Sequence, residues 1–96
     1  MARYISFIQF TEKGAQGAKK STERAGSFRQ LAEKGGVKVE AQYWTVGPYD
    51  GVLILSAPKA EQALHVLTEL VAGGYVKTQT MQAFTAEEFG AIVGGS

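Results

Sequence analysis

The chain lacks cysteine and has one histidine among its 96 residues. Without cysteine it can form neither a disulfide framework nor a thiolate metal site, and one histidine gives little support for a zinc or haem site inside one subunit. No apolar run approaches the ~20 residues that a bilayer-spanning helix needs. The opening Met1-Ala2-Arg3-Tyr4 also lacks the pattern of a signal peptide. We therefore expect a soluble, cytoplasmic protein with no membrane association and no cofactor.

The chain also lacks a strong excess of positive or negative charge. The formal net charge is +1 at pH 7, and the lysines and arginines are dispersed along the chain. A nucleic-acid-binding surface needs a basic stripe that neutralises backbone phosphates. We therefore expect no nucleic-acid partner. With 45% hydrophobic residues, the length fits one globular domain over residues 1–96.

Apolar patterns predict four strands and three helices. The strand-like runs are residues 4–10, 37–43, 52–55 and 75–84, and the second of them alternates for three full periods. Helical spacing predicts one helix between residues 17 and 35 and another from Pro58 to the glycines at 73–74. Thr85 can cap a short last helix with Glu88 reaching back three residues later, and residues 94–96 should fray beyond it.

The resulting order, βαββαβ, is the ferredoxin-like arrangement: one antiparallel sheet with two helices on one face. In this fold the first and third strands are central, and the second and fourth are edges. The sequence agrees, because only the first and third runs are apolar on both faces. The other two carry charged and amide side chains: Lys38, Glu40, Gln42, Lys77 and Gln79.

The two apolar faces of the central strands predict association. On the first strand Tyr4 and Ile8 point opposite to Ile5 and Phe7, and residues 52–55 repeat this arrangement on the third strand. Two helices on one side leave the other face uncovered. We expect the sheet of a second subunit to cover it, giving a homodimer or a higher homo-oligomer. An exposed apolar patch on a monomer is the alternative.

A tight hairpin brings unusual side chains together. In Tyr43-Trp44-Thr45-Val46-Gly47-Pro48-Tyr49-Asp50 a strand meets a Gly-Pro break and then re-enters an apolar run. This segment resembles the GYD domain family of small bacterial and archaeal proteins, whose Gly, Tyr, Asp signature is Gly47-Pro48-Tyr49-Asp50 here. The resemblance continues through Phe10-Thr11, Gly14, Arg24, and residues 77–80 and 83–88.

The family resemblance implies a dimeric α/β-barrel-type fold and a biochemical role that is largely undetermined. The chain departs from the family pattern around Ala57-Pro58, where Ser56 and Lys59 stand in place of the usual acidic residues. A function that depends on those carboxylates is therefore not implied. The hairpin also resembles the Gly-x-Tyr-Asp turn in the effector-binding domain of leucine-responsive transcription regulators. In those proteins amino acids bind between subunits, although this chain has no helix-turn-helix.

Asp50 and Arg24 each have two interpretations. Asp50 can hydrogen-bond the hairpin backbone, or it can line a polar pocket mouth with Arg24 or Tyr43, where burial would raise its pKa and make it a general base. Arg24 lies one position off the apolar stripe of its helix, where it can form an ion pair at the rim or anchor an anion. Tyr43 and Trp44 point to opposite faces, so one of them lies under the helices or at the rim.

Three residues on the second predicted helix have a spacing that a metal site could use, but a row of charged side chains facing water explains them better. Glu61, His65 and Glu69 stand four residues apart on its outward side, and charged residues at this spacing commonly face water. We expect no metal site there.

These observations favour an oligomeric domain that binds a small anionic or apolar metabolite and performs no covalent chemistry of its own. The candidate ligand-binding residues are Arg24, Tyr43, Trp44, Tyr49 and Asp50. One alternative is a cofactor-independent oxygenase or isomerase, a chemistry that dimeric α/β barrels often host. Another is a purely structural assembly unit whose edge strands pair into larger rings.

Overall fold

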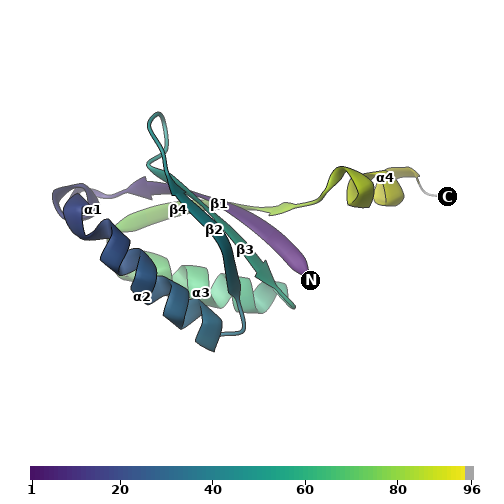
Figure 1. Ribbon diagram of the computed structural model, residues 1–96, viewed down its shortest axis with the longest axis horizontal. Helices are drawn as coiled ribbons and strands as arrows, with labels where there is room; N and C mark the ends of the chain where they lie inside the picture. The colour runs from purple at the N-terminus through teal and green to yellow at the C-terminus, as the bar shows by residue number, and fades with distance from the viewer. Residues whose placement is uncertain (95–96) are drawn as a thin grey trace.

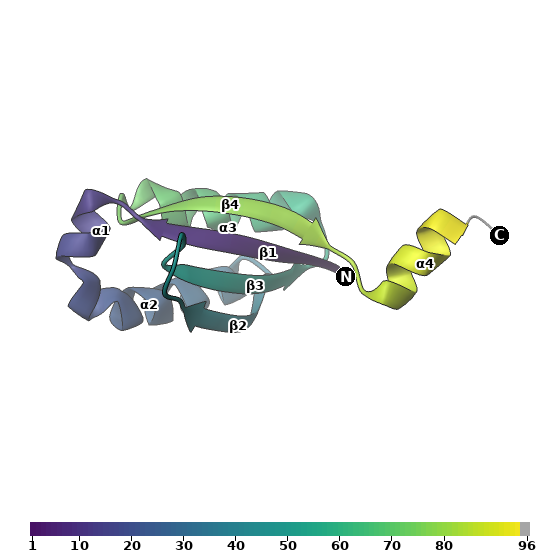
Figure 2. The ribbon, with the colours of Figure 1, turned by 90° about the horizontal axis from the view of Figure 1, so that it is seen from above.

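The computed structural model describes residues 1–94. One four-stranded antiparallel sheet, in the order β2-β3-β1-β4, has helices on one of its faces (Figures 1 and 2). The strands are β1 (Ala2–Phe10), β2 (Lys38–Trp44), β3 (Gly51–Ala57) and β4 (Val76–Ala83). The helices are α1 (Glu12–Gln16), α2 (Ser21–Lys34), α3 (Ala60–Ala72) and α4 (Ala86–Gly94), and a 3₁₀ turn spans Ala18–Lys20. The ferredoxin-like α+β fold and the central positions of β1 and β3 are confirmed.

Helix α1 is an element that the sequence pattern did not predict. Thr11 caps its N-terminus: the side-chain hydroxyl accepts a hydrogen bond from the Gly14 amide at 3.1 Å and donates one to the Gly74 carbonyl at 2.6 Å. Gly14 itself is buried, and a Cβ there would overlap the carbonyl oxygen of Tyr75. Only glycine therefore lets α1 pack this closely against the start of β4.

The last helix is present as predicted, but it stands away from the rest of the molecule. The Thr85 hydroxyl accepts from the Glu88 amide, and the Glu88 carboxylate accepts from the Thr85 amide at 2.7 Å, which completes the capping box. Helix α4 buries none of its residues and projects beyond the end of the sheet (Figures 1 and 2). Gly94 belongs to α4, and the fraying predicted for residues 95–96 concerns positions outside the described residues. No helix among residues 1–94 is long and apolar enough to cross a bilayer.

The hydrophobic core lies between the sheet and helices α2 and α3. It contains Tyr4, Ile8, Phe28, Ala32, Val37, Val39, Leu53, Leu55, Ala57, Ala63, Val66 and Leu67. Burying each large apolar side chain stabilises the fold by about 1.5–3 kcal/mol. Leu64 and Val71 of α3 are exposed, although they stand at helical spacing from the buried Leu67. The apolar face of α3 is therefore wider than the part of it that packs against the sheet.

The second face of the sheet is apolar and open. Ile5 and Phe7 on β1, and Val52 and Ile54 on β3, point away from the helices and are half-buried. This confirms the two-faced pattern of the central strands. We call the surface formed by these four side chains the open face.

A β-bulge in β2 corrects the alternation predicted for this strand. Val39 pairs with Leu55, but Ala41 pairs with the next residue of β3, Ile54, so Glu40 is an extra residue in β2. Regular alternation over residues 37–43 would have placed Tyr43 on the side of Val39. Because of the bulge, Tyr43 instead lies on the side of the open face.

Candidate functional site

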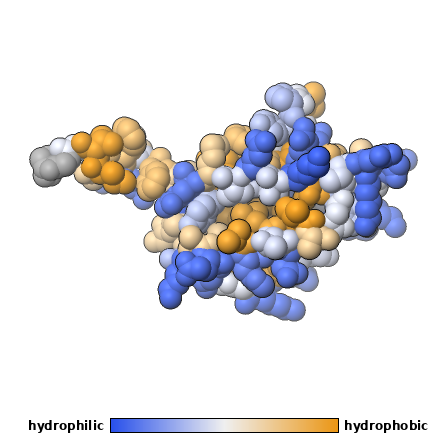
Figure 3. Space-filling view, turned by 180° about the vertical axis from the view of Figure 1, so that it is seen from behind, coloured by the Kyte–Doolittle hydropathy of each residue, from blue (hydrophilic) through white to orange (hydrophobic). Residues whose placement is uncertain are grey.

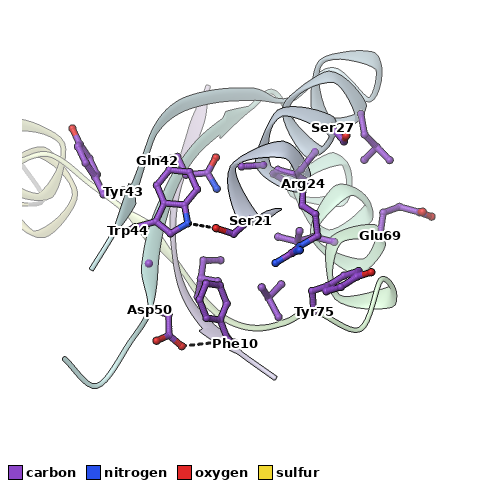
Figure 4. Close-up of a pocket in the computed structure, with 17 residues that line it drawn as sticks. Phe10, Ser21, Arg24, Ser27, Gln42, Tyr43, Trp44, Asp50, Glu69 and Tyr75 are labelled. Carbon is purple, nitrogen blue, oxygen red and sulfur yellow. Dashed lines mark hydrogen bonds between the residues drawn. The ribbon is translucent and has the colours of Figure 1, made fainter. Parts of the chain in front are cut away.

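A cavity of about 280 Å³ lies between α2, the sheet and the C-terminal part of α3 (Figure 4). Most of its lining is apolar and comes from Ile8, Phe10, Ala25, Phe28, Leu31, Leu70 and Val76. Polar groups surround this apolar interior: Ser21, Arg24, Gln42, Asp50 and Glu69. An apolar cavity with a few polar groups is the usual composition of a small-molecule site.

Arg24, on α2, supplies a cationic group to the cavity. Its Nη1 donates a hydrogen bond to the Gly17 carbonyl at 2.9 Å, and its guanidinium carbon lies 4.2 Å from the centroid of the Tyr75 ring. Its Nη2 is buried and has no hydrogen-bond partner among the described residues. Within residues 1–94, Arg24 forms no ion pair. Among the described residues, one guanidinium donor of Arg24 therefore makes no hydrogen bond.

Asp50 fastens the hairpin to β1. Its Oδ2 accepts a hydrogen bond from the Phe10 amide at 2.7 Å, and its own amide donates to the Ile8 carbonyl at 2.9 Å. The Thr45 amide donates to the Asp50 carbonyl at 2.9 Å. The carboxylate therefore serves the backbone role that Asp often has at turns, while it also borders the cavity (Figure 4).

Trp44 and Tyr43 are adjacent in β2, so their side chains point to opposite faces of the sheet. The Trp44 indole Nε1 donates to the Ser21 hydroxyl at 3.0 Å, so this ring joins the end of β2 to the start of α2 at the cavity rim. Tyr43 also borders the cavity, but its ring points away from it (Figure 4). Both residues therefore border the cavity, and the Trp44 ring is the one that contacts α2 at its rim.

Tyr49 lies on the opposite side of the sheet from the cavity. Its ring stacks on Phe7 with centroids 4.8 Å apart and planes 20° apart. Its hydroxyl donates to the Gln79 amide oxygen at 3.0 Å. The structure thus brings Arg24, Trp44 and Asp50 to one cavity and places Tyr49 over part of the open face.

Tyr75 is a cavity residue that sequence reasoning missed. It precedes β4 and meets two cations: Lys13 Nζ lies 4.3 Å from the ring centroid, and the Arg24 guanidinium lies at 4.2 Å. The one hint in the sequence is that Tyr75, an aromatic residue, directly follows the glycine pair at residues 73–74. Because α1 was not predicted, nothing indicated that Lys13 would face this ring.

No metal-binding cluster occurs in the described part of the chain. Across residues 1–94, no three histidine, cysteine, aspartate or glutamate side chains group closely enough to hold an ion. Glu61, His65 and Glu69 are exposed along α3.

The fold and cavity define a ferredoxin-like α+β domain with an uncovered sheet face. The chain belongs to the GYD domain family, whose family model matches residues 4–93. It is 36% identical over 84 residues to a Thermus thermophilus protein named "Glutamine synthetase and cystathionine beta-lyase binding protein". That match covers 86% of this chain and 88% of the relative.

Solved structures show the same fold at lower identity. The crystal structure of an FFRP protein matches with a TM-score of 0.62 and 17% identity, covering 88% of this chain and all of that one. The crystal structure of the Thermus thermophilus protein TTHA0845 matches with a TM-score of 0.56 and 23% identity, covering 90% of this chain and 96% of that one. These likenesses extend to the fold alone.

Proposed function

We propose that this chain is an oligomeric binding domain whose cavity takes a small anionic ligand with an apolar body. The observation that carries the proposal is Arg24 Nη2, a buried guanidinium donor that has no partner within residues 1–94 and belongs to a residue lining a mostly apolar cavity. A buried donor left unpaired costs about 1–3 kcal/mol, and more when the group is charged. A carboxylate on the ligand would remove this cost by accepting the hydrogen bond.

The cavity lining supports binding rather than covalent chemistry. A carboxylate on the cavity wall, Asp50, accepts from the Phe10 amide and so has a structural partner. This engagement weakens the alternative of a cofactor-independent oxygenase or isomerase that uses Asp50 as a base. Trp44 offers a flat apolar surface at the rim, which suits the body of a ligand whose anionic end meets Arg24, while the Tyr75 ring packs against the Arg24 guanidinium.

Titration calorimetry with valerate and with uncharged 1-pentanol tests this proposal. Valerate should bind more tightly than the alcohol, and Arg24→Met should weaken its binding about 10- to 100-fold, the usual size of a charged hydrogen bond. Arg29→Met is the matched control, because Arg29 is exposed on the same helix. Equal losses of valerate affinity in the two variants, or no binding of valerate to the unaltered protein, would refute the role of Arg24 in binding the anion. Native mass spectrometry of untreated protein would show any cellular ligand as excess mass released on denaturation.

We also propose that two copies associate through their open faces. The half-buried side chains of Ile5, Phe7, Val52 and Ile54 form a continuous apolar surface, which monomeric proteins rarely expose. Tyr49 stacks over Phe7 and covers only part of it. Sedimentation velocity at a series of concentrations should show a dimer or larger species. A monomer throughout that series would contradict the proposal and leave the cavity proposal standing.

Binding to another protein is a second candidate function. The observation that favours it is the name of the 36% identical relative, which describes a protein that binds glutamine synthetase and cystathionine β-lyase. Surface plasmon resonance with immobilised chain and those two enzymes, taken from the chain's own organism, tests this candidate. Saturable binding to either enzyme would support it, and no response to both would remove it.

A further inference from the structure

Helix α4 presents an apolar surface that no residue among 1–94 covers. Phe89, Ile92 and Val93 are 58%, 62% and 61% exposed, and no residue of the helix is buried. The helix extends past the end of the sheet in two perpendicular views (Figures 1 and 2). A nine-residue helix is marginal by itself in water, so its stability depends on packing against a partner.

The same molecule has an apolar groove without an occupant. The groove runs between α3 and β4, and its lining includes Tyr4, Leu64, Leu67, Val71, Thr78 and Thr80. Leu64 is 67% exposed and Val71 is 41% exposed. No residue that lines the groove carries a charge. Figure 3 shows an apolar hollow in the middle of this face, surrounded by hydrophilic side chains. We call it the α3–β4 groove.

The α4 helix of the same chain is held away from this groove. Two residues, Phe84 and Thr85, separate β4 from α4, so the three steps from Ala83 to Ala86 reach at most about 11 Å. The capping box between Thr85 and Glu88 fixes how the helix starts, and Arg3 Nη1 pairs with Glu88 Oε1 at 3.4 Å. These contacts direct α4 outward, where another molecule can meet it.

The helix and the groove match in chemistry and in length. After the acidic first turn at Glu87 and Glu88, residues 89–94 of α4 are all uncharged, as is the groove lining. Nine helical residues span about 13.5 Å, and the groove lining follows α3 from Ala60 to Ala72, a length of about 18 Å, so α4 is short enough to lie within it. We propose that α4 of one copy docks in the α3–β4 groove of a second copy.

This docking goes beyond the proposed ligand function, because it uses neither the cavity nor the open face. When two copies exchange helices reciprocally, each contact occurs twice, which is the self-complementary arrangement of a two-fold dimer. Each copy then contributes both an arm and a groove. The same contact made with a third copy would link molecules into larger assemblies.

Cross-linking between different single-cysteine variants tests the docking directly, because the chain has no cysteine of its own. Full-length Ile92→Cys is mixed with full-length Leu64→Cys and treated with a short bismaleimide. The expected product is a heterodimer linking α4 of one copy to α3 of the other. Glu69→Cys replaces Leu64→Cys in the control mixture, because Glu69 is exposed on the side of α3 that borders the cavity.

The outcomes decide between occupants of the groove. A heterodimer yield well above that of the Glu69→Cys control supports the proposal. Equal yields, no heterodimer, or a cross-linked monomer from the Leu64→Cys/Ile92→Cys double variant would overturn it. As a second measurement, made in the Ile54→Lys background so that the open face does not contribute, Ile92→Asp should weaken self-association about tenfold or more, whereas Glu87→Gln should leave it unchanged. Unchanged self-association of Ile92→Asp would also overturn the proposal.

Discussion

The two faces of the sheet carry similar side chains but differ in how they are covered. Leu53 and Leu55 on β3 are fully buried under the helices, whereas Val52 and Ile54 on the same strand are only half-buried on the open face. The difference arises because both crossover connections place their helices, α2 and α3, on one side of the sheet. The apolar residues of a strand therefore show that both of its faces need to be buried. The crossover connections determine which of the two faces the chain's own helices cover.

The largest expected effect contrasts neighbouring residues of β3. Leu55→Ala should lower the free energy of unfolding by about 2–5 kcal/mol, because it opens a cavity in the closed core. Ile54→Ala removes a side chain from the open face, so its cost should be smaller and should grow with protein concentration as association contributes. Urea unfolding followed by circular dichroism at two protein concentrations measures both. If both variants lost a similar amount of unfolding free energy, independent of protein concentration, the two faces would not differ in the way described.

A charge on the open face should separate association from folding. Ile54→Lys is expected to weaken self-association by about 100-fold or more, since a buried lysine without a partner is costly at an interface. The monomer should stay folded, because the same lysine faces water there. Sedimentation equilibrium measures the first effect and circular dichroism the second, with Thr22→Lys on the exposed side of α2 as the control. Association as strong as in the control would mean that the open face is not the interface.

A smaller effect is expected at Asp50, where the hairpin joins β1. Asp50→Asn keeps an acceptor for the Phe10 amide but removes its charge, so the free energy of unfolding should fall by about 1 kcal/mol. Hydrogen exchange at the Phe10 amide should accelerate in parallel. Lost valerate binding in a variant of unchanged stability would instead show that Asp50 acts on the ligand.

The smallest effect concerns the start of α4, beside the open face. The Thr85 amide, which donates to the Glu88 carboxylate, lowers the pKa of Glu88 below its ordinary value of 4.5, and Arg3 adds to the shift. Because the folded pKa is the lower one, the stabilisation is present above pH 4.5 and is lost as pH falls through the lowered pKa. Amide NMR shifts of residues 85–89 should follow this titration, and Glu88→Gln should flatten it.

Much of the fold could be predicted because local patterns and topology agreed. Apolar residues on both faces marked β1 and β3 as the central strands, and Thr85 with Glu88 marked the start of α4. Helix α1 was missed because Thr11-Glu12-Lys13-Gly14 has the composition of a strand end. Its stability comes from the close approach of Gly14 to Tyr75, a contact between residues distant in sequence.

The candidate site could be predicted only in part. Arg24, Asp50 and Trp44 come from separate elements, and the fold does bring them to one cavity. Tyr49 is next to Asp50 in the chain, yet it lies on the open face, because the loop turns its ring onto Phe7. Tyr75 could not be predicted from its neighbours, since the cations that surround it arrive from α1 and α2.

The β-bulge in β2 makes the length of this strand adjustable. Residues an odd number apart face opposite sides of a regular strand, yet Val39 and Trp44 both face the helices here because Glu40 is the extra residue. Deleting Glu40 would make the strand regular while Tyr43 and Trp44 kept their present sides. Loss of one residue at this position is therefore a change that leaves the residues of both faces on their present sides.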